Sequence, residues 1–185
     1  VTVLPLPVST FSANIQQGCA PLSVDFTADV LSNTSYTWQT SNQLNASGAQ
    51  TSFDFQANGS YSITLTATLN GCSTTNTLSN MIEVDNYPIA SFEPSAEVFT
   101  QPNQQLSFWN NSNGASTYQW NFGEGGSSTD EGPSYIFNLD NEGTTVTLFA
   151  YSNLGCLDTV SLFIGFDPGL VYYIPNTFTP DGDQF

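Results

Sequence analysis

The sequence repeats itself once, and this duplication restricts the possible folds more than any other feature. Five short motifs recur in the same order, 81 to 84 positions apart. They are STF at 9–11 with ASF at 90–92, VDF at 24–26 with LSF at 106–108, YTW at 36–38 with YQW at 118–120, ITLTA at 63–67 with VTLFA at 146–150, and GC at 71–72 with GC at 155–156. This period is that of a small domain. We predict two tandem domains, residues 1–86 and 87–167, and a segment, 168–185, too short to build a core.

Within each repeat, apolar and polar residues alternate, as they do in strands that turn one face to a core. Asn70-Gly71 lies between two such runs and is a strong signal for a two-residue β-hairpin. Six or seven short strands per repeat, with turns every 8 to 12 residues or so, are typical of an immunoglobulin-type sandwich. The prediction is all-β: two immunoglobulin-like sandwiches stacked end to end, with an extended C-terminal segment. Trp38 and Trp120, on the third strand of each repeat, are expected to anchor the cores.

The stretch YQWNFGEGG, residues 118–126, leads from alternating aromatic residues into a glycine-rich turn. We expect Trp120 and Phe122 to point into the core, and the three glycines to supply turn conformations closed to other residues. A phosphate-binding glycine loop would need a following helix and basic residues nearby. The sequence offers neither, so the turn is interpreted as structural.

At this turn the sequence resembles the PKD (polycystic kidney disease) type of domain, which is marked by W-D-F-G-D-G, H-x-Y and G-x-Y-x-V-x-L. The second repeat has WNFGEG at 120–125, PSY at 133–135 and TVTL at 145–148. The first repeat keeps Trp38 and has GSYSITL at 59–65, but replaces the turn with QTSNQ at 39–43. The resemblance covers residues 9–166 and implies tandem PKD-type sandwiches.

The last residues, YIPNTFTPDGDQF at 173–185, resemble the opening of the gliding-motility-associated C-terminal domain of Bacteroidota, I-P-N-x-F-T-P-N-G-D-G-x-N-D. In that family the domain is a sorting signal for the type 9 secretion system. The resemblance implies a secreted or outer-surface protein with the type 9 machinery as a partner, and PKD arrays ahead of such a signal are typical of very large adhesins. The start, VTVLPLPVST, lacks the basic region of a signal peptide. We expect the sequence to be part of a longer chain.

The chain carries 16 acidic residues and no Lys, Arg or His, a formal charge of -16. Nucleic-acid binding needs cations against phosphates, so it is excluded, and an anionic membrane surface would repel the chain. Without histidine or lysine there is no Ser-His or Cys-His catalytic pair and no P-loop lysine. No run of about 18 apolar residues is present, so membrane insertion is not expected. The acidity either keeps the surface soluble by self-repulsion or reflects the exclusion of sites for trypsin-like proteases.

Three cysteines, an odd number, leave three arrangements open. Cys72 and Cys156 each follow a hairpin glycine, whereas Cys19 precedes the second strand. In one sandwich these positions lie at opposite ends, roughly 20 Å apart, and a disulfide needs Cα atoms within about 7 Å. We predict an interdomain bridge from Cys19 to Cys156, which leaves Cys72 to bond an upstream domain. The alternatives are a Cys19–Cys72 bridge and free thiols.

Carboxylates are the remaining candidates for catalysis, because a pair of them can hydrolyse glycosides. The candidates, expected mostly at turns and not in one pocket, are Asp25, Asp29, Asp54, Glu124, Asp130, Glu131, Asp140 and Glu142. We therefore predict no enzymatic activity.

Calcium is the one cofactor that the sequence suggests, because hard oxygen ligands are abundant. Asp181 and Asp183 have the alternating spacing of a calcium loop, and Asp85 at the domain join is a candidate for a second site. Asp158-Thr159-Val160 matches the O-glycosylation pattern of Bacteroidota, which predicts a glycan on Thr159.

Together these features predict an extracellular, cell-surface protein whose two domains act as a stiff spacer. The expected function is a stalk in a large adhesin or filament exported by the type 9 system, with neighbouring domains of the same chain as partners. One alternative is a carbohydrate-binding module that contacts polysaccharide through Trp109, Tyr151, Tyr172 or Tyr173. Another is an accessory region of a secreted hydrolase.

Overall fold

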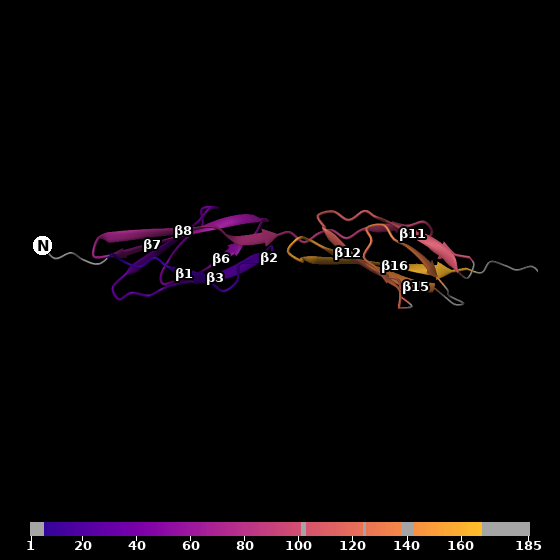
Figure 1. The fold of residues 1–185 in the computed structure, drawn as a ribbon, viewed down its shortest axis with the longest axis horizontal. Helices are drawn as coiled ribbons and strands as arrows, with labels where there is room; N and C mark the ends of the chain where they lie inside the picture. The colour runs from indigo at the N-terminus through magenta and orange to yellow at the C-terminus, as the bar shows by residue number, and fades with distance from the viewer. Residues whose placement is uncertain (1–5, 101–102, 124, 138–142, 168–185) are drawn as a thin grey trace, which may run out of the picture.

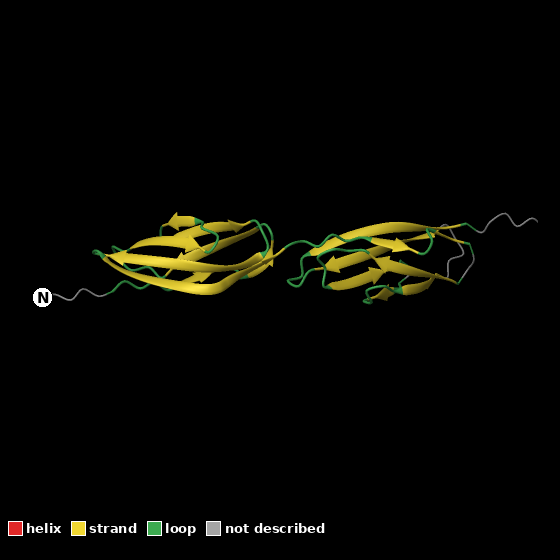
Figure 2. Cartoon of the chain, turned by 90° about the horizontal axis from the view of Figure 1, so that it is seen from above, coloured by secondary structure: helices red, strands yellow, loops and turns green. Residues whose placement is uncertain are grey.

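The computed structural model describes residues 6–100, 103–123, 125–137 and 143–167, and within these ranges the chain forms strands and no helix (Figure 2). The strands build two β-sandwiches that follow one another along a single long axis (Figure 1). The prediction of two immunoglobulin-like sandwiches stacked end to end is confirmed. The predicted C-terminal segment, 168–185, lies outside the described residues.

The first sandwich, domain one, has eight strands in two sheets. The three-stranded sheet has the order β1-β3-β6 and the five-stranded sheet the order β2-β8-β7-β4-β5, with β2 parallel to β8. The strands are β1 (Phe11–Ala13), β2 (Gln17–Cys19), β3 (Leu22–Ala28), β4 (Ser35–Thr40), β5 (Asn45–Ser47), β6 (Gln50–Phe55), β7 (Gly59–Leu69) and β8 (Cys72–Asp85).

Domain two repeats this plan strand for strand. Its sheets have the orders β9-β11-β14 and β10-β16-β15-β12-β13, and β10 is again parallel to the last strand. The strands are β9 (Phe92–Pro94), β10 (Val98–Phe99), β11 (Gln104–Asn110), β12 (Thr117–Asn121), β13 (Ser127–Ser128), β14 (Ser134–Phe137), β15 (Gly143–Tyr151) and β16 (Leu157–Phe166). The predicted number of strands per repeat, six or seven, was too low. The edge strands have two or three residues, which is too short to show an alternating pattern.

Each core lies between its two sheets and is anchored by a tryptophan. Trp38 and Trp120 are almost completely buried. Their indole N–H groups donate to main-chain carbonyl oxygens, of Gly48 at 2.8 Å and Asp130 at 2.9 Å. Burying an indole without such a partner would cost free energy, so these bonds let each ring fill the core.

The glycine-rich turn after Trp120 has the structural role expected of it, with one correction. Gly123 and Gly125 have positive φ angles, 76° and 85°, which other residues rarely adopt. Gly126 does not: a Cβ there would lie 2.4 Å from the ring of Tyr135, which stacks on Phe122 with centroids 4.4 Å apart. The third glycine is therefore required for space and not for its backbone angle.

Hydroxyl pairs cross-link the outer face of the five-stranded sheet in domain one, where a protein with basic side chains could use ion pairs. Facing hydroxyls on β7 and β8 are within hydrogen-bond distance in three successive rungs, Thr64–Thr77 at 2.9 Å, Thr66–Thr75 at 3.1 Å and Thr68–Ser73 at 2.8 Å. In domain two only the rung Thr147–Ser161 keeps this form, at 2.8 Å. Phe149 and Tyr151 replace the next two threonines of the inner strand.

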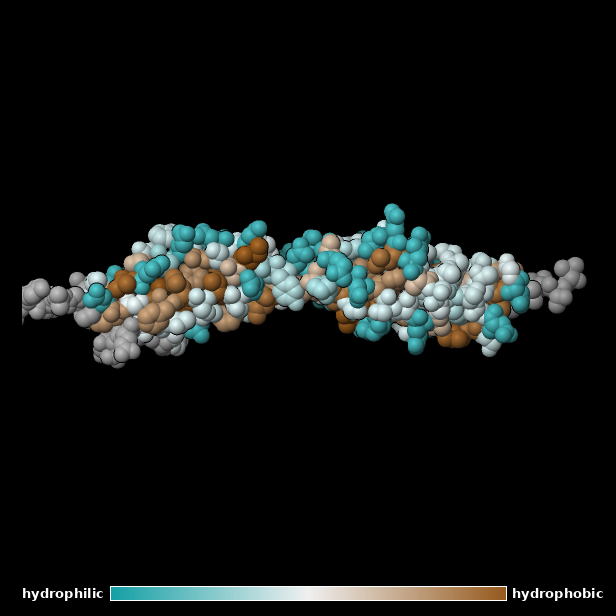
Figure 3. Space-filling model, turned by 180° about the vertical axis from the view of Figure 1, so that it is seen from behind, coloured by the Kyte–Doolittle hydropathy of each residue, from teal (hydrophilic) through white to brown (hydrophobic). Residues whose placement is uncertain are grey.

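Each sandwich has two poles. The N-terminal pole carries the turn between the last two strands, β7 and β8 or β15 and β16, and the loop that leads into β4 or β12. The C-terminal pole carries the ends of the parallel pair, β2 with β8 or β10 with β16. The C-terminal pole of domain one meets the N-terminal pole of domain two, and the molecule narrows there to a waist (Figure 3).

Candidate functional site at the interdomain joint

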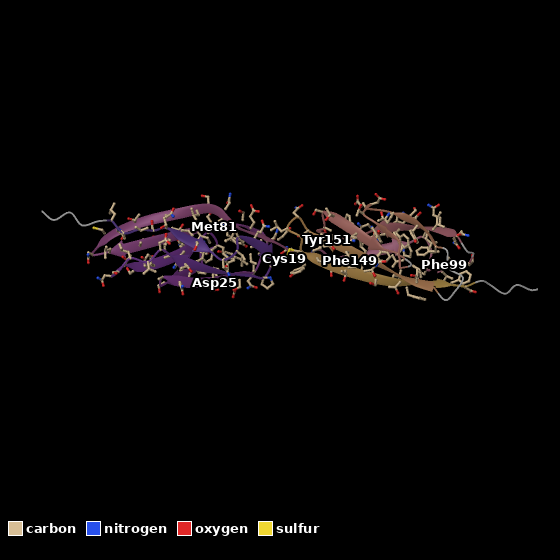
Figure 4. The ribbon with its side chains drawn as sticks, turned by 60° about the horizontal axis from the view of Figure 1, so that its bottom comes forward. Cys19, Asp25, Met81, Phe99, Phe149 and Tyr151 are labelled. Carbon is tan, nitrogen blue, oxygen red and sulfur yellow. A yellow bond between two sulfur atoms is a disulfide. The ribbon has the colours of Figure 1, made fainter. Side chains whose placement is uncertain are left out.

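A disulfide bond closes the joint between the two domains. Cys19 at the end of β2 is bonded to Cys156, which directly precedes β16, with an S–S distance of 2.04 Å and a Cα–Cα distance of 5.7 Å. Figure 4 places Cys19 at the waist between the two sandwiches. The prediction of a Cys19–Cys156 bridge is confirmed, and the Cys19–Cys72 alternative is wrong, because Cys72 lies at the opposite pole of domain one.

Cys72 is a half-buried free cysteine at the first residue of β8. The turn before it, Asn70-Gly71, has φ angles of 50° and 85°, as the predicted two-residue hairpin requires. This turn forms part of the N-terminal pole of domain one, away from the joint (Figure 1).

Asp85, the last residue of β8, supplies the electrostatic part of the joint. Its carboxylate accepts a hydrogen bond from the main-chain N–H of Leu154 in domain two at 3.2 Å. The hydroxyl of Ser152 and the N–H of Asn153 also donate to it. The bond from Ser152 is the largest influence and holds the pKa of Asp85 below its ordinary value, although partial burial acts in the opposite direction. The protein has no basic side chain, so hydroxyl and main-chain N–H donors stabilise the ionised carboxylate in place of a salt bridge.

The main-chain carbonyl of Asp85 holds the end of β2, which carries Cys19, in place. It accepts a hydrogen bond from the N–H of Ala20 at 2.8 Å, and its oxygen lies 3.9 Å from the sulfur of Cys156. That sulfur is oxidised and carries no proton, so the second contact is one of packing. The same residue therefore contacts both cysteine segments of the joint.

The connection along the chain is short. β8 ends at Asp85, and Ile89 already forms a β-bridge to Asn113, with hydrogen bonds of 2.8 and 2.9 Å in the two directions. Between them Pro88 is buried and has its φ angle fixed by its ring. Three residues, 86–88, remain to act as a hinge.

Two covalent ties at separate points restrict the joint more than one tie does. A single linker leaves the second domain free to bend in two directions and to twist. The disulfide is a second attachment, so motion is reduced to rotation about the line through the two ties, and the bonds to Asp85 oppose that rotation. The arrangement transmits force between the domains and fixes their relative orientation.

The carboxylates considered for catalysis lie on several different elements where the structure describes them. Asp25 and Asp54 lie in the middle of β3 and at the fifth position of β6, on the outer face, which corrects their expected placement at turns. Glu124, Asp140 and Glu142 lie outside the described residues. Within the described ranges no three His, Cys, Asp or Glu residues are grouped as metal ligands would be.

The remaining predicted sites have separate positions. Asp181 and Asp183, the expected calcium ligands, lie outside the described residues. Asp85 accepts hydrogen bonds from hydroxyl and N–H donors. Calcium takes about six to eight oxygen ligands, and hydrogen-bond donors are not such ligands. Thr159 is exposed on β16, opposite Phe149, and its glycosylation stays a prediction.

The aromatic residues considered for carbohydrate binding lie on two different faces where the structure describes them. Trp109 is 56% exposed on the outer face of the three-stranded sheet of domain two. Tyr151 is half-buried in the five-stranded sheet, where it lines a shallow surface groove with Thr117, Gln119 and Glu131. These rings cannot contact one saccharide together, and Tyr172 and Tyr173 lie outside the described residues.

Sequence reasoning missed the donors that hold Asp85. They lie in the turn before Cys156, SNLG at 152–155, which is one residue longer than its counterpart LNG at 69–71. The signal was present in the repeat spacing, because the offset between the repeats rises from 83 at Ala67 and Ala150 to 84 at Cys72 and Cys156. The added residue lies in the turn that contacts domain one.

The chain matches no protein-family model and no curated protein. Among solved structures it is similar to the fibronectin(III)-like modules of Clostridium thermocellum CbhA, with 16% identity over 85% of this chain and 95% of that chain and a TM-score of 0.46. It is also similar to murine CEACAM1b, with 13% identity over 86% of this chain and 100% of that chain and a TM-score of 0.48. The fold is therefore assigned from the chain's own sheets and their order. Among the described residues none forms a helix able to cross a bilayer.

Proposed function

We propose that this chain is a stalk segment, a stiff spacer that holds other domains of a surface protein at a distance. The observation that carries the proposal is the double covalent tie at the waist, formed by the three-residue linker and the Cys19–Cys156 disulfide. A flexible tether needs no such tie, whereas a rod that keeps its direction under load does. The strong net charge adds repulsion between neighbouring rods.

The location proposed for the stalk is outside the cell. A disulfide persists in an oxidising compartment, and the resemblance of residues 173–185 to a type 9 sorting domain supports export by that system to the outer surface, as part of a large adhesin or filament. Cell fractionation with and without a working type 9 system tests this. The full-length protein should be lost from the surface when the system is disabled, and a protein that still reaches the surface would contradict this route.

The stiffness itself can be measured on the chain in hand. Two variants are compared, Cys72→Ser, which keeps the joint, and Cys72→Ser with Cys19→Ser and Cys156→Ser, which opens it. Small-angle scattering and the distance distribution between labels on the two domains report the range of bending. The proposal expects one narrow distribution for the first variant and a broader one with shorter distances for the second. Equal distributions would contradict a role for the joint in stiffness.

A second candidate function, binding of a neutral polysaccharide, is favoured by one observation, the groove that Tyr151 lines with Thr117, Gln119 and Glu131. An aromatic ring beside amide, hydroxyl and carboxylate groups can pack against a sugar and bond its hydroxyls. Binding to a glycan array that Tyr151→Ala abolishes and Trp109→Ala leaves intact would support this groove. The stalk proposal requires no ligand, so the two functions are compatible. An accessory role beside a catalytic domain would show as a hydrolase elsewhere in the same polypeptide.

A further inference from the structure

Cys72 occupies the position in domain one that Cys156 occupies in domain two. Thr68 pairs with Ser73 where Tyr151 pairs with Leu157, and in each domain the cysteine is the next residue toward the turn. One cysteine of this equivalent pair is bonded to a neighbouring sandwich, and the other is a half-buried thiol. The molecule thus contains one complete joint and, at the N-terminal pole of domain one, half of a second.

The path by which the chain enters each domain is also repeated. Residues 6–9 and 87–90 share one pattern, in which the second residue is a buried proline and the residues on either side are exposed. A side chain of the last strand holds each segment: Asn76 donates to the carbonyl of Ser9 at 3.1 Å, and Asp158 accepts from the N–H of Ala90 at 2.8 Å. A domain that precedes Leu6 would therefore be guided toward the turn carrying Cys72, as domain one is guided toward the turn carrying Cys156.

The N-terminal pole of domain one is more apolar than the pole that domain two presents to the joint. Val30 and Leu31, which are 72% and 38% exposed, stand at the positions of Ser112 and Asn113. Leu69 takes the place of Ser152, so this pole lacks the hydroxyl that bonds Asp85. The contact that fits here is less polar than the existing one.

The other end of the molecule cannot supply the missing half. In domain two the position equivalent to Cys19 is Thr100, because Phe99 pairs with Phe166 as Gly18 pairs with Val84. A second copy of this chain therefore presents no cysteine at its C-terminal pole, and head-to-tail joining of copies by this disulfide is excluded.

We infer that the N-terminal pole of domain one docks a further β-sandwich that directly precedes it in the same polypeptide, and that Cys72 closes a disulfide to it. This inference rests on the proposed stalk function and names its partner. The partner carries a cysteine at the end of a short strand parallel to its last strand, as Cys19 is placed, and apolar residues opposite Val30 and Leu31. Forming the bond removes two protons and two electrons from the two thiols. A disulfide oxidant accepts them and is itself reduced to two thiols.

The test reproduces the missing half of the joint with this protein's own sequence. A copy of residues 6–86, with Cys72→Ser and Asp85→Ala in the copy, is placed directly before Leu6 of the chain, so that Asn86 of the copy continues into Leu6. The change at Asp85 removes a carboxylate for which Leu69 offers no hydroxyl donor. The matched control has Cys19→Thr in the copy, which imitates Thr100. Both proteins are reoxidised with glutathione disulfide, alkylated and digested with chymotrypsin, because the absence of Lys and Arg leaves no site for trypsin.

The expected result is a linked pair of Cys19 and Cys72 peptides in the test protein beside the native Cys19–Cys156 pair. A cysteine held by a short linker has an effective concentration of about 1 mM. At about 10 µM protein, the link within the chain should therefore exceed links between chains roughly a hundredfold. The control should show only the native pair, with Cys72 alkylated.

Two outcomes would overturn the inference. In one, Cys72 of the test protein stays alkylated while the native pair forms, so the pole does not accept a C-terminal pole. In the other, Cys72 is linked in the control as well, so its partner is not the docked cysteine. Neither outcome affects the stiffness of the Cys19–Cys156 joint, which is measured with Cys72 replaced, so failure of the inference is separable from failure of the stalk proposal.

Discussion

The two domains share the plan of their interior and differ on their exterior. Each has eight strands in the same order around a tryptophan whose N–H is bonded to a main-chain carbonyl. Outside, domain one has a ladder of hydroxyl pairs where domain two has Phe149 and Tyr151, and the turn at the N-terminal pole is a residue longer in domain two.

This difference shows that the residues needed to fold a sandwich are distinct from the residues needed to join two sandwiches. The core requires alternation and large rings, which both repeats supply. The joint requires a cysteine at one pole and a cysteine with polar donors at the other, and of the described poles only the facing pair meets this requirement. A few residues at the two poles therefore determine that the duplicated domains are joined end to end in one direction.

The largest expected effect tests the shared interior. Trp120→Ala and Trp38→Ala should each destabilise their own domain by about 4 kcal/mol, because each removes a fully buried indole and leaves a cavity. Chemical denaturation followed by tyrosine and tryptophan fluorescence measures this. The matched control is Trp109→Ala, whose ring is 56% exposed and whose loss should change the free energy of unfolding by less than about 0.5 kcal/mol. Equal losses of unfolding free energy for the three variants would contradict the role of Trp38 and Trp120 as core anchors.

The next effect tests the joint against the unpaired pole. Opening the disulfide with Cys19→Ser and Cys156→Ser should lower the free energy of unfolding by about 3 kcal/mol, because it frees a loop in the unfolded chain. Cys72→Ser should change it by less than about 0.5 kcal/mol, since that side chain forms no disulfide within these 185 residues. Both are measured by denaturant unfolding without reductant. A large cost for Cys72→Ser would mean that its thiol contributes to packing.

A smaller effect distinguishes the two reasons for glycine in turns. Gly126→Ala should cost about 2 kcal/mol, because the new Cβ overlaps the ring of Tyr135, which is stacked on Phe122 and cannot move away. Gly71→Ala meets no atom within 4 Å and should cost only about 1 kcal/mol, for the positive φ angle. Thermal unfolding of both variants ranks them, and the reverse order would contradict the steric argument.

The smallest effect concerns the acid at the joint. The pKa of Asp85 is lower in the folded protein than in the unfolded chain, so its stabilisation is present above the unfolded value of about 3.9 and is lost as the pH falls through the folded value. Asp85→Asn should cost about 1 kcal/mol at neutral pH and remove part of the decline below about pH 4.

The control for the acid variant is Asp54→Asn on the outer face of β6, because acid also relieves the general repulsion among carboxylates. Stability curves from pH 7 to about pH 3 compare the two variants with the parent chain. Identical curves for Asp85→Asn and Asp54→Asn would show that the joint gains nothing from its carboxylate.

Much of the fold could be predicted from the residues alone. The spacing of Trp38 and Trp120 revealed two domains, and the alternation around them revealed strands. The cysteine positions, combined with the end-to-end arrangement, led to the Cys19–Cys156 bridge. The short edge strands and the reason for Gly126 were not accessible, because two or three residues carry no period and a steric conflict with Tyr135 depends on where a distant strand lies.

The sequence alone determined the two-fold plan, the all-β class and the absence of any basic side chain, because these follow from the order and kind of residues. Only the tertiary structure decided which groups meet at the waist. Ser152 and Leu154 lie nearly 70 positions from Asp85 in the chain, and nothing local distinguishes them from any other polar turn. They become its donors because the linker and the disulfide bring two separate poles together, and proximity between distant segments is a property of the folded chain.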